Sequence, residues 1–184
     1  MTGKYLFAAA LAAMSAPAGG AVTVIGNTSA RLCYEAAEAR ISPARDSIAT
    51  CDAALYNEGL SRDDRVATLV NRGILRMRGG AFDPAIADFD AAIADDPKQA
   101  EAYLDKGMAL VRAGRDWESA VALFNTALEM RTRKPALAYY GRAVAQESRG
   151  RIKDAYLDYR EASRLDPKWR DPQVELTRFS VRSQ

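Results

Sequence analysis

The chain has 184 residues, with 26 lysines and arginines against 24 aspartates and glutamates. This near balance argues against a nucleic-acid-binding protein, which usually carries a clear basic excess. Histidine is absent, so the commonest general base and metal ligand is missing. The sequence also lacks a glycine-rich phosphate loop followed by lysine and a paired-cysteine metal motif. We therefore expect no enzymatic activity, no cofactor and no bound metal.

Residues 1–18 have the pattern of a secretory signal peptide. Lys4 makes the start positive, residues 5–14 are apolar but too short to span a bilayer, and residues 16–18 (APA) resemble a cleavage site. We expect cleavage after residue 18, with residue 21 as the alternative, and an uncleaved anchor is the competing interpretation. No later run is long and apolar enough for a membrane span.

The next segment predicts an arm followed by a short helical hairpin. Residues 19–28 are bounded by glycines around a β-prone run, which predicts an extended arm that could pack along the first helices. Residues 29–40 and 44–57 have apolar side chains at helical spacing, and Pro43 separates the two helices. Together they predict a degenerate hairpin over 29–61.

Cys33 and Cys51 stand nine residues on either side of Ser42, where the hairpin should turn. Antiparallel helices place residues equidistant from their turn at the same height, so a disulfide between the two cysteines is geometrically sensible. An even cysteine count in an exported chain also favours a disulfide, and two buried free thiols are the alternative. The arginine and alanine richness suggests a GC-rich bacterial genome, so we expect a periplasmic or extracellular location.

Three longer copies of one helix–turn–helix pattern follow, over residues 66–99, 100–135 and 136–169. Each second helix carries a small residue, an aromatic residue and another small residue at matched spacing: Ala85, Phe89 and Ala92; Ala120, Phe124 and Ala127; and Ala155, Tyr159 and Ala162. Each first helix carries a small residue at one shared position: Gly73, Gly107 and Ala143. A period of about 34 residues with small residues where helices cross predicts a helical solenoid. Residues 171–182 predict a helix that caps its open end.

At these residues the chain resembles the tetratricopeptide repeat family. The resemblance implies an all-α, right-handed superhelix of antiparallel helix pairs over residues 29–184, with about three full repeats, the degenerate hairpin and the capping helix. It further implies a non-enzymatic scaffold that binds a protein or peptide segment in a concave groove lined mainly by the first helices. Mapped onto this sequence, the expected partner-binding residues are Val70, Ile74, Leu104, Met108, Tyr140 and Val144.

The expected groove is apolar, which suits an amphipathic helix or an extended hydrophobic segment. The family's chaperone-binding members use a lysine–asparagine carboxylate clamp, and the six residues above do not provide one. Three alternatives stay open, one of which is a stabilising module with no dedicated ligand. Some of these side chains could be ordinary core, and the protein could instead carry or sense a small hydrophobic ligand, lipid or peptide.

Two arginines depart from the family pattern in a regular way. Arg72 is followed after sixteen residues by Asp88, and Arg142 is followed after sixteen residues by Asp158. The middle copy has neither an arginine nor an aspartate at these positions. We therefore predict two structural Arg–Asp pairs, each bridging the two helices of one repeat.

Overall fold

The computed structural model describes residues 20–24, 28–39 and 45–179, so the expected signal peptide lies outside the described residues. In this part of the chain all regular structure is helical. The helices are α1 (Thr28–Glu38), α2 (Arg45–Asn57), α3 (Arg62–Arg78), α4 (Phe82–Asp95), α5 (Ala100–Ala113), α6 (Trp117–Glu129), α7 (Pro135–Ser148), α8 (Ile152–Leu165) and α9 (Arg170–Leu176).

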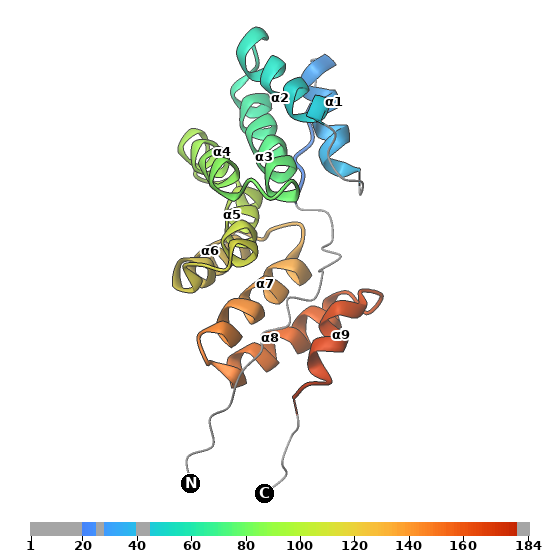
Figure 1. The fold of residues 1–184 in the computed structure, drawn as a ribbon, viewed down its shortest axis with the longest axis vertical. Helices are drawn as coiled ribbons and strands as arrows, with labels where there is room; N and C mark the ends of the chain where they lie inside the picture. The colour runs from blue at the N-terminus through green and yellow to red at the C-terminus, as the bar shows by residue number, and fades with distance from the viewer. Residues whose placement is uncertain (1–19, 25–27, 40–44, 180–184) are drawn as a thin grey trace, which may run out of the picture.

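The helices form successive pairs that follow one another along the long axis of the molecule (Figure 1). Each first helix packs on its own second helix and also on the first helix of the next pair, so α3 contacts α4 and α5, and α5 contacts α6 and α7. The largest core cluster runs from α1 to α7, and a second cluster joins α7 to α8, as expected of a superhelix in which each pair packs on its neighbours.

Aromatic rings from the second helices fill the space beside glycines of the first helices. A Cβ atom added at Gly73 would lie 2.5 Å from Phe89 Cε1, and one added at Gly107 would lie 2.9 Å from Phe124 Cε1. Phe124 also reaches the following pair, because a Cβ atom at Gly141 would lie 2.4 Å from its Cζ. The small residues thus allow each ring to pack against helix backbone.

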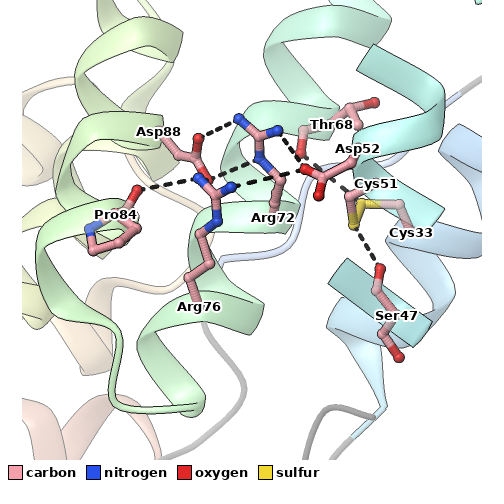
Figure 2. Close-up of polar contacts among 9 residues, drawn as sticks. All are labelled: Cys33, Ser47, Cys51, Asp52, Thr68, Arg72, Arg76, Pro84 and Asp88. Carbon is pink, nitrogen blue, oxygen red and sulfur yellow. Dashed lines mark hydrogen bonds and ion pairs between the residues drawn. A yellow bond between two sulfur atoms is a disulfide. The ribbon is translucent and has the colours of Figure 1, made fainter. Parts of the chain in front are cut away.

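The Arg72 guanidinium joins three helices (Figure 2). It donates to both carboxylate oxygens of Asp88 on α4, at 3.1 and 2.6 Å, and to Asp52 on α2 at 2.7 Å. Asp88 also accepts a 2.8 Å hydrogen bond from Arg76. The bidentate contact joins the two helices of one repeat, and the contact to Asp52 ties that repeat to the preceding hairpin.

The third repeat uses the same arrangement. Arg142 donates to both oxygens of Asp158, at 2.8 and 2.7 Å, and its remaining terminal nitrogen donates to Asn125 of α6 at 2.6 Å. In the middle repeat Lys106 instead bonds to Asp90, on the preceding helix, at 2.6 Å. In repeats one and three the arginine therefore joins its own second helix to the preceding pair.

Cys33 and Cys51 form a disulfide between α1 and α2, with their Cα atoms 5.0 Å apart (Figure 2). Both side chains are fully buried. In the chain-entropy model, closing a loop of 18 residues stabilises the fold by about 3 kcal/mol. The disulfide therefore secures a hairpin that has fewer large side chains than the pairs that follow.

The C-terminal capping helix ends before residue 182, the expected bound, and residues 180–182 of the expected range 171–182 lie outside the described residues. It starts at Arg170 and ends at Leu176, and residues 177 and 178 form a turn. After the turn the ring of Phe179 lies 5.9 Å from the ring of Tyr159. The chain thus covers the end of the stack with a short helix and an aromatic contact, where the apolar pattern alone predicts a longer helix.

Candidate partner-binding face

An extended arm, residues 20–24, lies along the face formed by the first helices α3 and α5, which we call the inner face. Val22 donates its N–H to Asn71 Oδ1 at 2.9 Å, and Asn71 Nδ2 donates to the Val22 carbonyl at 2.8 Å. The N–H of Gly20 donates to Asp105 Oδ1 at 3.2 Å. Side chains of the first helices thus bind the main chain of the arm.

The connector between α6 and α7 also binds the arm, in addition to α3 and α5. Arg133 donates from its guanidinium to the Ala21 carbonyl at 3.1 Å. Glu101 fixes this arginine, because its Oε1 accepts from the Arg133 backbone N–H at 3.0 Å and from Nε at 3.3 Å. Glu101 is itself only 5 % exposed. Glu101 therefore holds Arg133 in place against the arm.

The residues of the arm differ in exposure, and those at its two ends are buried. Ala21 and Val24 are 5 % and 4 % exposed, whereas Thr23 is exposed and Val22 half-buried. Val24 packs among small residues of the first hairpin and α3: Ala30, Ala54 and Ala67. The arm is therefore held by main-chain hydrogen bonds and by two small apolar contacts.

The six residues expected to line the groove lie mainly inside the core. Val70, Ile74 and Leu104 are fully buried, and Met108 and Tyr140 are 3 % and 4 % exposed. Only Val144 is half-buried. The apolar side chains of each first helix pack inside the protein, because that helix contacts both the second helix of its own pair and the helices of neighbouring pairs. A direct role of these six side chains in partner binding stays a prediction.

Sequence reasoning missed Asn71 and Asp105, the two side chains that bind the arm from the helices. Both occupy the same repeat position, two residues before Gly73 and Gly107 respectively. Both are completely buried. A polar residue recurring at one position within an otherwise apolar first helix is the signal that could have found them. The third repeat has Gly141 there, so its inner face offers no equivalent side chain.

Asp105 is an unusual carboxyl group. It is fully buried, and its Oδ2 atom has no hydrogen-bond partner among the described residues. Burial raises its pKa from 3.8 to about 7. The Gly20 N–H and the positive charges of Lys134 and Arg78 oppose this rise in pKa, and the charge of Glu101 adds to it. The protonated form is therefore strongly favoured in the folded protein at mildly acidic pH.

We expect the stability of the protein to fall as the pH rises toward 8. The raised pKa means that the folded state holds a proton that the unfolded chain has released, so the stabilisation exists in mild acid and is lost as the pH rises through about 7. Between pH 5 and pH 8 the wild type should lose about 2–3 kcal/mol relative to Asp105→Asn, which cannot titrate. Urea unfolding of both proteins measures the difference, and parallel pH profiles would contradict it.

Three further features of the described residues concern metal binding, membrane crossing and a pocket. No cluster of three metal-binding side chains occurs in the described part of the chain, and none of its helices is long and apolar enough to cross a membrane. A pocket of about 280 Å³ lies between α6, α7 and α8. Its lining is mostly polar and charged: Asn125, Arg142, Gln146, Asp154, Leu157 and Asp158.

The stacked helix pairs with an extended segment on their inner face define a helical-repeat protein. A tetratricopeptide repeat model matches residues 70–116 and 113–168, more than half of the chain. The chain therefore belongs to the tetratricopeptide repeat family. No curated protein is significantly similar to it in sequence.

Two solved structures share the fold. The first tetratricopeptide domain of Spaghetti (RPAP3), bound to the HSP90 peptide SRMEEVD, is 22% identical with a TM-score of 0.57, covering 61% of this chain and 88% of that chain. The tetratricopeptide domain of Arabidopsis OM64 is also 22% identical, with a TM-score of 0.60, covering 64% of this chain and 96% of that chain. At this identity the likeness concerns the fold.

Proposed function

We propose that this protein is a non-enzymatic scaffold that binds an extended segment of another protein along its inner face. One observation carries the proposal. Asn71 bonds both the N–H and the carbonyl of a single residue, Val22, which is how an amide side chain holds an extended main chain. Tetratricopeptide repeats bind proteins and peptides, and the similar domain of Spaghetti (RPAP3) is bound to a peptide. Both facts support a peptide-binding role.

The mode of binding that we propose differs from the apolar groove that the sequence indicates. Contacts to the main chain supply affinity without regard to side chains, and small apolar pockets then select among segments. Asn71, Asp105 and Arg133 supply the main-chain contacts. We further propose that the protein works outside the bacterial cytoplasm, because an oxidising compartment preserves a bond such as Cys33–Cys51.

The test is retention of a binding partner by matched asparagine variants. Affinity-tagged intact protein, Asn71→Ala and Asn57→Ala would be incubated with a bacterial envelope extract, and the proteins retained would be quantified by mass spectrometry. Asn57 is exposed at the end of α2 and serves as the control. A true partner should be retained by the intact protein and by Asn57→Ala, and its recovery should drop about tenfold or more with Asn71→Ala.

Equal retention by all three proteins would show that the inner face is not the binding site. Circular dichroism of each variant confirms that the helices persist. The buried Leu104 is unsuitable for such a test, because a charge placed there would disrupt the core itself.

A further inference from the structure

We propose that residues 20–24 are a resident ligand of the inner face, which a partner segment of the same pattern must displace. The pattern is glycine, a small residue, two variable residues and then a small aliphatic residue. This inference rests on the proposed function and deepens it, because it names the kind of segment that the face accepts and the state of the face before a partner arrives.

The arm has the position of a bound peptide and is anchored through main-chain atoms. The Gly20 N–H, the Ala21 carbonyl and both polar groups of Val22 are bonded to side chains of the inner face and of the α6–α7 connector. These bonds depend on an extended backbone and on no side chain of the arm. Any other extended segment could therefore make them equally well.

The side-chain environments of the arm define the pattern. Gly20 has no room for a side chain, because an added Cβ atom would lie 2.7 Å from Glu101 Cγ. Glu101 cannot easily move away, since Arg133 and Thr132 hold its carboxylate. Ala21 is 5 % exposed and packs in the main core cluster, so a bulky side chain there would have to displace core residues. The first two positions therefore reject bulky side chains.

The remaining positions of the arm are less restrictive. Val22 is half-buried and Thr23 is exposed, so both tolerate substitution. Val24 is 4 % exposed among the alanines Ala30, Ala54 and Ala67, whose small side chains leave room for one aliphatic group. A partner segment with this pattern would fit the inner face at the positions of Gly20, Ala21 and Val24, where the face limits the size of the side chain.

The arm belongs to the same chain as the face, and this favours self-occupation. Residue 24 is followed after three residues by the start of α1. A short tether gives an intramolecular ligand an effective concentration of about the millimolar range. A free peptide of the same sequence would therefore compete poorly with the arm until the arm is evicted.

The test uses the full chain and substitutions on opposite sides of the contact. The probe is an acetylated peptide with the sequence of residues 19–26, labelled at its carboxyl end and followed by fluorescence anisotropy. Gly20→Gln should evict the arm and leave the face intact, so that the peptide binds about tenfold more tightly, or better, than to the unchanged protein. Adding Asn71→Ala to this variant should reverse the gain. Thr23→Gln, at the exposed position, should behave like the unchanged chain.

A second probe tests the pattern itself. A peptide with valine in place of its Gly20 equivalent should lose about tenfold or more in affinity for the Gly20→Gln protein, whereas lysine in place of the Thr23 equivalent should change little. If Gly20→Gln remains helical but binds the peptide no better than the unchanged protein, the arm is not a displaceable ligand and the inference is wrong.

Another measurement covers the case in which Gly20→Gln does not fold. Excess peptide added to the unchanged chain should accelerate amide hydrogen exchange in the arm, and no acceleration at saturating peptide would overturn the inference.

The outcomes also separate this inference from the proposed function. Peptides without the pattern that bind Gly20→Gln as well as the arm peptide does would overturn the pattern but leave extended-segment binding intact. If the arm peptide binds Gly20→Gln but the partner retained from the envelope extract does not compete with it, only the proposed function is contradicted.

Discussion

Replacing Phe124 by alanine should lower the free energy of unfolding by about 3–5 kcal/mol. The ring is fully buried and packs beside two first helices, α5 at Gly107 and α7 at Gly141. Its loss leaves a cavity that these helices cannot close by small shifts, because each also packs on other elements of the stack. Urea unfolding followed by circular dichroism measures the change.

The matched control for this prediction is Leu157→Ala on α8. Leu157 is 41 % exposed, so its truncation removes little buried surface and should cost less than about 1 kcal/mol. Similar effects for the two substitutions would show that Phe124 does not join neighbouring repeats as the structure describes.

Replacing Asp88 by alanine should cost about 3–5 kcal/mol, because two guanidinium groups lose their shared carboxylate. Asp88 is 2 % exposed and Arg72 is 6 % exposed, so water cannot easily replace the lost contact. Burial by itself lowers the pKa of Arg72, but hydrogen bonds and the charge of Asp88 outweigh burial and raise that pKa above its usual value. An arginine stays protonated in proteins even without a carboxylate partner, so Asp88→Ala leaves a largely buried charge at Arg72 with only Asp52 to pair with, and this explains the large loss.

Two further variants distinguish a buried pair from a surface pair. Arg72→Ala should also destabilise the protein, although less, since Asp88 keeps its bond to Arg76. Asp90→Ala, an exposed carboxylate on the same helix that pairs with Lys106, should cost about 1 kcal/mol or less. If Arg72→Ala had no effect while Asp88→Ala was destabilising, the pairing would not be the cause.

The repeated architecture could be predicted from sequence because it depends on local periodicity. Phe89 lies 16 residues after Gly73 and Phe124 lies 17 residues after Gly107, and each pair of positions meets within one helix hairpin. Contacts between repeats are harder to predict. Gly141 stands two residues before the matched position of its own repeat, and its role becomes apparent only beside the ring of Phe124 from the preceding repeat.

The inner face could not be predicted from the same pattern. Family positions indicate apolar residues such as Leu104 and Ile74, which the structure places in the core, and their direct role in partner binding stays a prediction. Asn71 and Asp105 bind the arm. The sequence predicts that residues 19–28 could pack along the first helices, but the arm has no periodic counterpart that would indicate which side chains bind it. The arm is positioned mainly by hydrogen bonds of its main chain, which every residue type can make, so the sequence does not predict them.

Amide hydrogen exchange at Val22, measured by NMR in the full chain, tests most directly whether the inner face binds an extended main chain. The bond to Asn71 predicts that this amide exchanges about tenfold or more slowly than an unstructured peptide amide, and that Asn71→Ala removes the protection. Exchange at the unstructured rate in the unchanged protein would contradict the account.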